Sequence, residues 1–545
     1  MTTARHQAIT FDVGPTFVLP DLGALPDAAG TGTPAETQLD VACYDTPDLR
    51  LARARVTLQR STGGDGAGWL VELPGGDGGR RELRRPAGRA TKAPPKAVLE
   101  PLAGLVRQAT VGQVARLQTR RTVVPLTDAD GRVLAEVADD QVTATTFAPD
   151  PGSPTEISTW RQIGVALVDG DEELLDRLAA GLLAAGAVHR PPGGRSAGPP
   201  DPDGGADPTS VDGKAAKAGK KGKGGKGGKG GKAARKSARK AAARAVEQAA
   251  ADGRTAGDVL ALALRGQLDA LQQADVMVRT DEPDGVHQVR VSCRRLRSTL
   301  TAYRAVLDRE RTEPLRGELA WLAAQLSGAR DREVALAHLQ EVVAAQPEEL
   351  VLGPVAARLQ QAQLRDAATG RAEALRALGN ARYLRLLDDL DDLVSAPPLT
   401  PRAARPARTV LGKALAAQAS RAGRRLGAAE EALAGADPVP DLHEVRKAAK
   451  RLRYTAEVAG PVLGPDAAGL VEAMKAVQDV LGDRQDTVVT RELCRRFGIE
   501  AFAAGENAWT FGRLHAFEEA RAAQAERAFR ELAPVLRAQL EQAGG

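Results

Sequence analysis

The spacing of apolar and polar residues divides the chain into two regions of different construction. Residues 1–190 contain short segments, such as AITFDV and GWLVELP, in which many apolar and polar residues alternate as in half-buried β-strands. Two helices are expected among them, one after the prolines at 94–95 and one from about Asp171 to Gly186. Residues 246–545 instead place apolar residues at helical spacing, with almost no strand signal. The pattern predicts an N-terminal α+β domain with an antiparallel β-barrel and a C-terminal all-α domain of about ten helices packed as bundles.

A stretch of different composition separates the two regions. Residues 191–245 begin with PPGGRSAGPPDPDGGADP and continue as a Lys/Gly/Ala-rich tract. Such a sequence has almost no apolar area to bury, so a disordered basic linker is expected. The predicted domains are therefore 1–190, the linker 191–245, and 246–545.

The charge of the chain is concentrated in that linker. The formal net charge is +5, and the tract from Lys214 to Arg244 alone holds 13 Lys and Arg and no acidic residue. Removing these 13 charges from +5 leaves −8 for the rest of the chain. The high pI therefore gives no argument for a nucleic-acid-binding fold, and 3% aromatic residues are too few for base-stacking platforms.

Other features of composition exclude further classes of protein. No apolar run approaches the roughly 18 residues of a membrane span, and the first residues lack the pattern of a secretory signal. The three cysteines are far apart, which excludes a disulfide framework and a cysteine zinc site. We expect a cytoplasmic protein with no membrane partner.

A duplicated segment carries the candidate chemistry. VHQVRVSCRRLRSTLTAYR at 286–304 and LHEVRKAAKRLRYTAEVAG at 442–460 share the pattern apolar-H-x-V-R-x-x-x-[RK]-R-L-R. A weaker echo follows each copy, with Gly328 in LAAQLSGARDREV and Gly482 in VQDVLGDRQDTV. The repetition predicts two halves related by a pseudo-two-fold axis.

On a helix, each copy forms a basic stripe beside an apolar face. Four residues of each copy fall within an arc of about 80°, and like charges stacked in this way repel by a few tenths of a kcal/mol per pair. Stability alone gives no reason to build such a stripe twice, whereas a bound polyanion does, because Arg binds phosphate oxygens in pairs and Lys acts as a point charge. The stripes are His287, Arg290, Arg294 and Arg297, and His443, Arg446, Lys450 and Arg453, with Arg295, Lys447 and Arg451 beside them.

Structural alternatives remain open for these residues. The stripe is also compatible with a solvated face or with ion pairs to acidic neighbours. The two histidines are compatible with buried, hydrogen-bonded roles, and a metal role has no carboxylate or cysteine at ligand spacing to support it. We expect Arg330, Asp331, Asp483 and Asp486 to begin helices and cap them or pair with the stripe arginines, and Lys475 and Gln478 to extend the basic surface.

The duplicated motif, followed by GARD and LGDRQD, resembles the CHAD domain (conserved histidine α-helical domain) over about residues 250–535. The resemblance implies a pseudo-symmetric pair of helical bundles that binds inorganic polyphosphate through basic helices lining a central groove. It places polyphosphate binding on the matching residues, which are His287, Arg290, Arg294, Arg295, Arg297, His443, Arg446, Lys447, Lys450, Arg451 and Arg453.

The N-terminal region resembles the CYTH domain of the triphosphate tunnel metalloenzymes in CYDTPDLRLARARVTLQR, RVLAEVADDQV and STWRQIGVALVDGDEELLDRL. The resemblance implies a tunnel of eight antiparallel strands, in which Lys and Arg bind triphosphate and carboxylates hold Mg²⁺ or Mn²⁺.

This chain departs from the CYTH motifs. Where the family has E-x-E-x-K on its first strand, this chain has His6, Ala8 and Thr10. In the late strand, Gln162, Gly164 and Ala166 stand where the family has carboxylates. The L-R-x-R pattern is LQRS at 58–61, and Glu72 replaces a lysine. We therefore assign no catalytic residue, metal or cofactor, and Mg²⁺ or Mn²⁺ enters only if the domain is active. The alternative is an altered site formed by a few of the remaining acids; the retained polar residues include Arg60, Arg120, Arg121, Glu136, Asp139 and Asp140.

Three functions follow from these features. The leading hypothesis is a polyphosphate-binding protein with a catalytically inactive CYTH-like domain, in the cytoplasm and associated with polyphosphate granules. The second is a metal-dependent inorganic triphosphatase. The third is weak, non-specific nucleic-acid binding through residues 214–244; the same tract is also compatible with a solubilising tether or a second, flexible contact to polyphosphate.

Overall fold

The computed structural model divides the chain into two compact units, residues 1–214 and 215–545, and each is described by itself. The predicted linker 191–245 lies outside the described residues, so the linker and the domain boundaries stay predictions. No side chain is described for residues 8, 80, 327–331 or 434. The structure describes residues 8–21, 30–62, 67–74, 80–88, 93–147, 155–190, 254–434 and 442–544.

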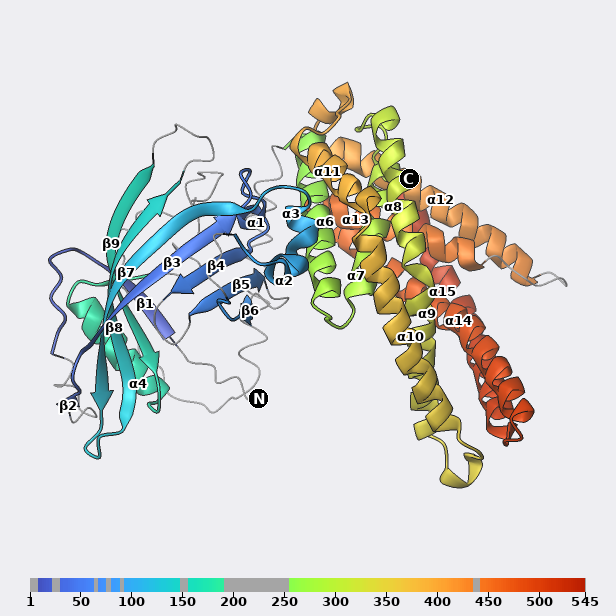
Figure 1. The fold of residues 1–545 in the computed structure, drawn as a ribbon. Helices are drawn as coiled ribbons and strands as arrows, with labels where there is room; N and C mark the ends of the chain where they lie inside the picture. The colour runs from blue at the N-terminus through green and yellow to red at the C-terminus, as the bar shows by residue number, and fades with distance from the viewer. Residues whose placement is uncertain are drawn as a thin grey trace, which may run out of the picture. The chain divides into compact units, whose positions relative to one another are not determined.

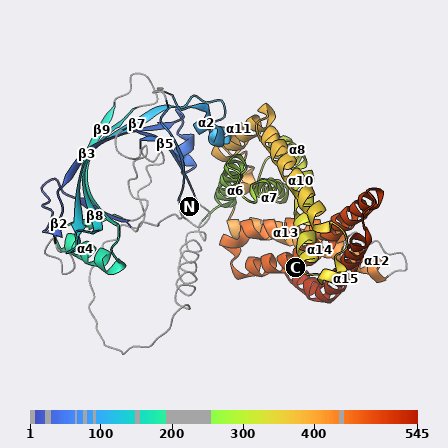
Figure 2. The same cartoon turned by 60° about the horizontal axis from the view of Figure 1, so that its bottom comes forward.

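The first unit is built on one antiparallel sheet, as the alternating pattern predicts (Figure 1). The hydrogen-bonded order is β10-β1-β9-β8-β7-β3-β4-β5-β6, and β2 pairs with β7. This order has two ends, so among the described strands the sheet curves strongly but stays open, without the closure expected of a tunnel (Figure 2). The strands are β1 (Ala8–Val13), β2 (Gly30–Thr31), β3 (Ala35–Asp45), β4 (Thr57–Thr62), β5 (Gly68–Pro74), β6 (Arg80–Arg85), β7 (Gly112–Thr127), β8 (Val133–Thr146), β9 (Glu156–Leu167) and β10 (Val188–His189).

Short helices connect and cover this sheet. The helix expected after residues 94–95 is a series of short pieces with Pro101 inside it, since proline lacks the N–H that a continuous helix needs. The helix expected from Asp171 is confirmed as α4, and the Asp171 carboxylate accepts a hydrogen bond from Leu174 N at 2.8 Å. Leucines of α4 pack on Val137 and Ile163 of the sheet. The helices are α1 (Arg50–Arg53), α2 (Lys96–Leu99), η2 (Glu100–Leu102), α3 (Ala103–Val106) and α4 (Glu172–Ala184).

Apart from connecting loops and two isolated β-bridges, the described residues of the second unit form helices, which confirms the predicted all-α region. Its helices range from short 3-10 turns to the long α14 and α15 (Figure 1). They are α6 (Ala256–Arg279), α7 (Gly285–Ala302), α8 (Arg309–Gln325), α9 (Ser327–Ala344), η3 (Glu348–Leu350), α10 (Val355–Leu378), α11 (Ala381–Ser395), η4 (Pro401–Ala404), α12 (Ala407–Ala434), α13 (Leu442–Leu463), α14 (Pro465–Ala503) and α15 (Trp509–Gly544).

Each copy of the repeat buries its apolar face in a different core. Cys293 and Leu296 of α7 belong to a core shared with α6, α8 and α11, whereas Ala449 and Leu452 of α13 belong to a core shared with α12, α14 and α15. The two halves meet because the end of α13, including Val458, also packs in the first core. Helices α7 and α13 are therefore neighbours, and this contact decides where the two basic stripes lie.

Among the described residues, no helix combines the length and the apolar character that crossing a membrane requires.

Candidate functional site

The contact between α7 and α13 brings the two basic stripes together. Lys450 of α13 is half-buried, and burial is the largest cause that lowers its pKa to about 8. The positive charges of Arg446, Arg294, Arg453 and Arg290 lower this pKa further, in that order of size. Two of these arginines, Arg290 and Arg294, come from α7, so residues 160 and 156 positions away along the chain act on one ammonium group. We call these five residues (Arg290, Arg294, Arg446, Lys450 and Arg453) the basic cluster.

A second group of neighbouring cations consists of Arg297, Arg316 and Arg451. Burial lowers the pKa of Arg297, and the charges of Arg316 and Arg451 lower it further. Arg316 belongs to α8 and was not predicted from the sequence, because it lies outside the repeat and only the packing of α8 against α7 brings it close. It also binds Glu313 at 2.6 Å, so its charge is partly balanced on its own helix.

Part of the basic surface has no acidic partner. Among the described residues, no ion pair involves Arg294, Arg297 or Lys450, and the Nε atoms of Arg294 and Arg297 are buried without a hydrogen-bond partner. The alternative in which acidic neighbours neutralise the stripe therefore does not apply to these three residues.

Other candidate cations do contact carboxylates. Lys447 is exposed and pairs with Glu444 on its own helix at 2.7 Å. Arg295 Nη2 lies 3.3 Å from Glu457 Oε2, and Arg453 Nε lies 3.4 Å from Glu457 Oε1. Acidic neighbours therefore partly neutralise Lys447, Arg295 and Arg453, as the ion-pair alternative expects.

Gly482 makes room for the Arg446 guanidinium. A Cβ at this position of α14 would lie 3.1 Å from Arg446 Nη2, which is closer than ordinary contacts allow. The contact is shown for the second copy only, because the surroundings of Gly328 lie outside the described residues. The expectation that Asp483 begins a helix and pairs with the stripe is wrong, because α14 continues through this position and Asp483 binds Arg521 of α15 at 2.8 Å.

The remaining predicted residues have mixed outcomes. His287 is partly buried on α7, whereas His443 is exposed, so a buried role for His443 is wrong. Gln478 is buried and donates to the Met474 carbonyl, so it does not extend the basic surface, while Lys475 is exposed. Asp486 lies inside α14 and begins no helix. Helix α9 begins at Ser327, so Arg330 and Asp331 lie near its start but do not begin it, and their side chains are outside the described residues.

In the sheet, the positions that replace the expected carboxylates and lysine of β1 lie opposite those that replace the carboxylates of β9. Thr10 of β1 pairs with Gly164 of β9, and Ala8 pairs with Ala166. By the alternation of side chains along a strand, Thr10, Gly164, Gln162 and Asp140 share one face. His6 lies outside the described residues.

Two of the retained acidic residues of the sheet, Asp139 and Asp140, are already bound by arginines. Arg121 holds Asp140, which is 2% exposed, through two hydrogen bonds of 2.7 and 2.8 Å, and Gln162 Nε2 donates a third at 3.1 Å. Arg161 holds Asp139 through two hydrogen bonds of 2.9 and 2.6 Å. Since consecutive residues of a strand point to opposite faces, Asp139 and Asp140 cannot converge on one cation.

The other retained residues of the sheet likewise lack the arrangement of a metal site. Arg60 lies over the Trp69 ring at 5.8 Å, Arg120 pairs with Glu36, and Glu136 is exposed. Among all described residues, no group of three or more His, Cys, Asp or Glu side chains is placed to hold a metal ion. The residues present therefore do not fit the metal that the CYTH resemblance implies.

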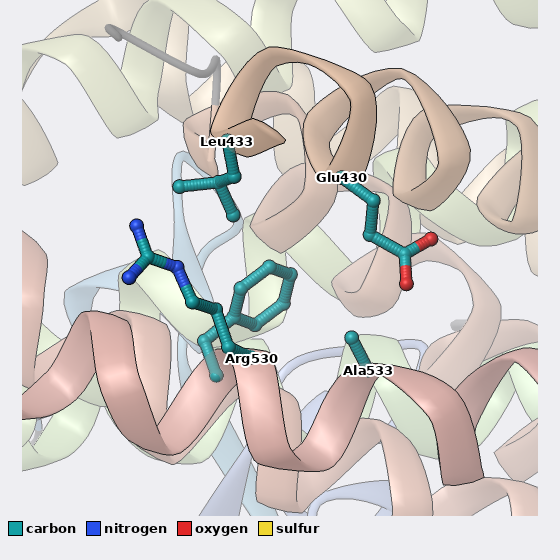
Figure 3. Close-up of a pocket in the computed structure, with 5 residues that line it drawn as sticks. Glu430, Leu433, Arg530 and Ala533 are labelled. Carbon is teal, nitrogen blue, oxygen red and sulfur yellow. The ribbon is translucent and has the colours of Figure 1, made fainter. Parts of the chain in front are cut away.

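A pocket of about 250 Å³ between α12 and α15 lies outside the candidate set (Figure 3). Glu430 and Leu433 come from α12, and Phe529, Arg530 and Ala533 come from α15. None of the eleven predicted residues lines it, and its lining has one acid and one base. The pocket has no net charge that would favour an anion.

A match to a protein-family model agrees with the CHAD resemblance of the helical region. Residues 262–495 match the CHAD domain family, so the helical unit carries a CHAD domain. The chain belongs to the same protein family as MT2285 and Rv2226 of Mycobacterium tuberculosis (strains CDC 1551 / Oshkosh and ATCC 25618 / H37Rv), both described as uncharacterized. Each is 34% identical over 554 residues, which covers 98% of this chain and 96% of the relative.

Two solved structures were also found to be similar. PptA from Streptomyces chartreusis is 23% identical, with a TM-score of 0.40, and the match covers 51% of this chain and 99% of that one. The CHAD domain from the plant Ricinus communis is 24% identical, with a TM-score of 0.42, and the match covers 53% of this chain and 93% of that one.

Proposed function

We propose that this protein binds inorganic polyphosphate through the basic cluster of α7 and α13. The observation that carries the proposal is the convergence of cations from both repeat copies around Lys450. Repulsion between like charges gives no stability, and Arg294 and Lys450 of the cluster form no ion pair among the described residues, so the arrangement is best explained by an anionic ligand. The CHAD match and the resemblance to that family support polyphosphate as the anion.

The chemistry of the ligand suits the cluster. Guanidinium groups donate paired hydrogen bonds to phosphate oxygens, and the Lys450 ammonium adds a point charge between them. Binding of a linear polyanion by several cations releases its counterions, so affinity falls steeply with salt concentration. A neighbouring phosphate also favours the charged form of Lys450, so binding takes up protons at and above pH 8.

The test is binding of long-chain polyphosphate to the full-length protein by gel retardation or fluorescence anisotropy. Replacing Arg290, Arg294, Arg446 and Lys450 with Glu should abolish binding. The matched control reverses four exposed arginines outside the cluster, Arg365, Arg376, Arg402 and Arg530, and should retain most of the affinity. Equal losses in the two variants would show that net charge, not the cluster, determines binding.

We infer that the sheet unit is a CYTH-like domain without metal-dependent catalysis. The support is that Asp139 and Asp140 lie on opposite faces and are each held by an arginine. Incubation with tripolyphosphate and Mg²⁺ or Mn²⁺ should release no phosphate above background. Metal-dependent turnover that copurifies with the protein would contradict this inference and favour the triphosphatase hypothesis.

For the basic tract at 214–244, the proposed role rests on the sequence alone. We propose that it adds a flexible contact to the same polyphosphate and accounts for any weak nucleic-acid binding. Deleting residues 212–245 should abolish DNA retardation and weaken polyphosphate binding without abolishing it. Unchanged DNA binding would place that activity elsewhere in the chain.

A further inference from the structure

Glu457 lies between two candidate phosphate-binding arginines that come from different halves of the helical unit. Its two oxygens lie 3.3 Å from Arg295 Nη2 of α7 and 3.4 Å from Arg453 Nε of α13. The side chains are 30%, 40% and 20% exposed, in the order Glu457, Arg295 and Arg453. All three groups are therefore within reach of a ligand from solvent.

The ion pairs of Glu457 with the two arginines have long distances and poor geometry. Neither arginine forms a hydrogen bond with Glu457, and both Nε atoms are buried with no hydrogen-bond partner in the described part of the chain. Arg121 and Asp140, in contrast, share two hydrogen bonds of 2.7 and 2.8 Å. Partly exposed ion pairs with long, non-ideal geometry contribute little to stability, so an anion that offers better geometry can replace this carboxylate.

The two arginines are held in place by a second residue. Their guanidinium carbons lie 5.7 Å (Arg295) and 4.9 Å (Arg453) from the centre of the Tyr454 ring, and Tyr454 is buried. A cation over an aromatic face is attracted to it without using the N–H groups. Tyr454 can thus keep both guanidinium groups near their positions when Glu457 leaves.

This arrangement belongs to one half only. The positions of the first copy that match Tyr454 and Glu457 are Ser298 and Thr301, and neither can supply a ring or a charge. The repeat therefore does not require the carboxylate, and its placement against one cation from each half needs a separate explanation.

We propose that Glu457 is a built-in competitor of phosphate, which occupies Arg295 and Arg453 in the free protein and is displaced when polyphosphate binds. The proposal rests on the proposed function and adds an autoinhibitory contact to the same site. Phosphate oxygens then take over both guanidinium groups, and the freed carboxylate turns to solvent.

The first experiment measures polyphosphate affinity of the full-length protein by fluorescence anisotropy. Glu457→Gln should bind about two- to fivefold more tightly, the range expected when a weak ion pair no longer competes. Glu457→Asp keeps the net charge but withdraws the carboxylate by one methylene, and should also bind more tightly. Glu492→Gln removes the same charge from an ion pair with Arg495 on α14 and should leave affinity nearly unchanged. Circular dichroism verifies that each variant is folded.

The second experiment is a double-mutant cycle with Arg295→Gln. If Glu457 competes, this change costs little affinity in the wild type and clearly more in the Glu457→Gln background, where Arg295 is free to bind phosphate. Weaker binding of Glu457→Gln, or equal effects of Arg295→Gln in both backgrounds, would overturn the proposal and leave polyphosphate binding intact. Absence of binding by the wild type would overturn the proposed function together with it.

Discussion

Replacing Lys450 with methionine should make the protein more stable and a weaker polyphosphate binder. Methionine keeps an unbranched side chain of similar length, so packing changes little, while the charge is removed. Lys450 is partly buried among four arginines and its pKa is lowered to about 8. The folded state therefore disfavours the charged form that the unfolded chain carries below its usual pKa of 10.5.

The size of the stability gain and its pH dependence follow from the difference between the two pKa values of Lys450. The difference between 10.5 and about 8 corresponds to about 3 kcal/mol at 1.36 kcal/mol per pH unit, and solvent screening at this partly exposed position reduces it to about 1–2 kcal/mol. Below pH 8 both states are protonated and the full penalty is present. Between pH 8 and 10.5 the unfolded state binds more protons than the folded state, so wild-type stability rises with pH and the penalty disappears near 10.5.

The assay is urea unfolding followed by far-ultraviolet circular dichroism at several pH values. Lys450→Met should exceed the wild type by about 1–2 kcal/mol at pH 7, and the two should converge as the pH approaches 10.5. Lys475→Met, at an exposed position of α14, serves as the control and should change stability by less than about 0.5 kcal/mol. A variant no more stable than the wild type at pH 7, or a gain that does not vary with pH, would refute the reasoning.

Three further perturbations test other parts of the structure. Gly482→Ala should weaken polyphosphate binding severalfold while changing the free energy of unfolding by less than about 1 kcal/mol, because the new Cβ displaces the flexible Arg446 guanidinium; unchanged affinity in anisotropy titrations would disconnect Gly482 from the site. Tyr303→Phe removes a 2.8 Å hydrogen bond to the Thr455 carbonyl between α7 and α13, and should cost about 1–2 kcal/mol in chemical denaturation; a neutral effect would mean that this bond does not join the two halves. Asp140→Ala leaves the Arg121 charge without its partner and should cost about 3 kcal/mol by the same measurement, more than Asp139→Ala, whose side chain is more exposed; the reverse order would contradict the assigned burial.

The local pattern was sufficient to predict many elements of secondary structure. The apolar spacing of 286–302 predicted α7, and the acidic residue before a leucine-rich run predicted the start of α4 at Asp171. Prediction was less reliable at glycine. Gly482 lies within α14 although glycine costs roughly 1 kcal/mol in a helix interior. The helix that was expected to begin at Asp483 does not exist as a separate element.

The sequence by itself determined which side chains can form a basic stripe, because helical periodicity and duplication are properties of neighbouring residues along the chain. Only the tertiary structure decided that the two stripes meet around Lys450, that Arg316 joins Arg297, and that Glu457 opposes Arg295. It also paired Asp140 with Arg121 and Asp139 with Arg161, since the faces of a strand acquire their surroundings only when the sheet forms. The physical reason is that charge interactions depend on distance and burial, and both are set by the packing of helices and strands far apart in sequence.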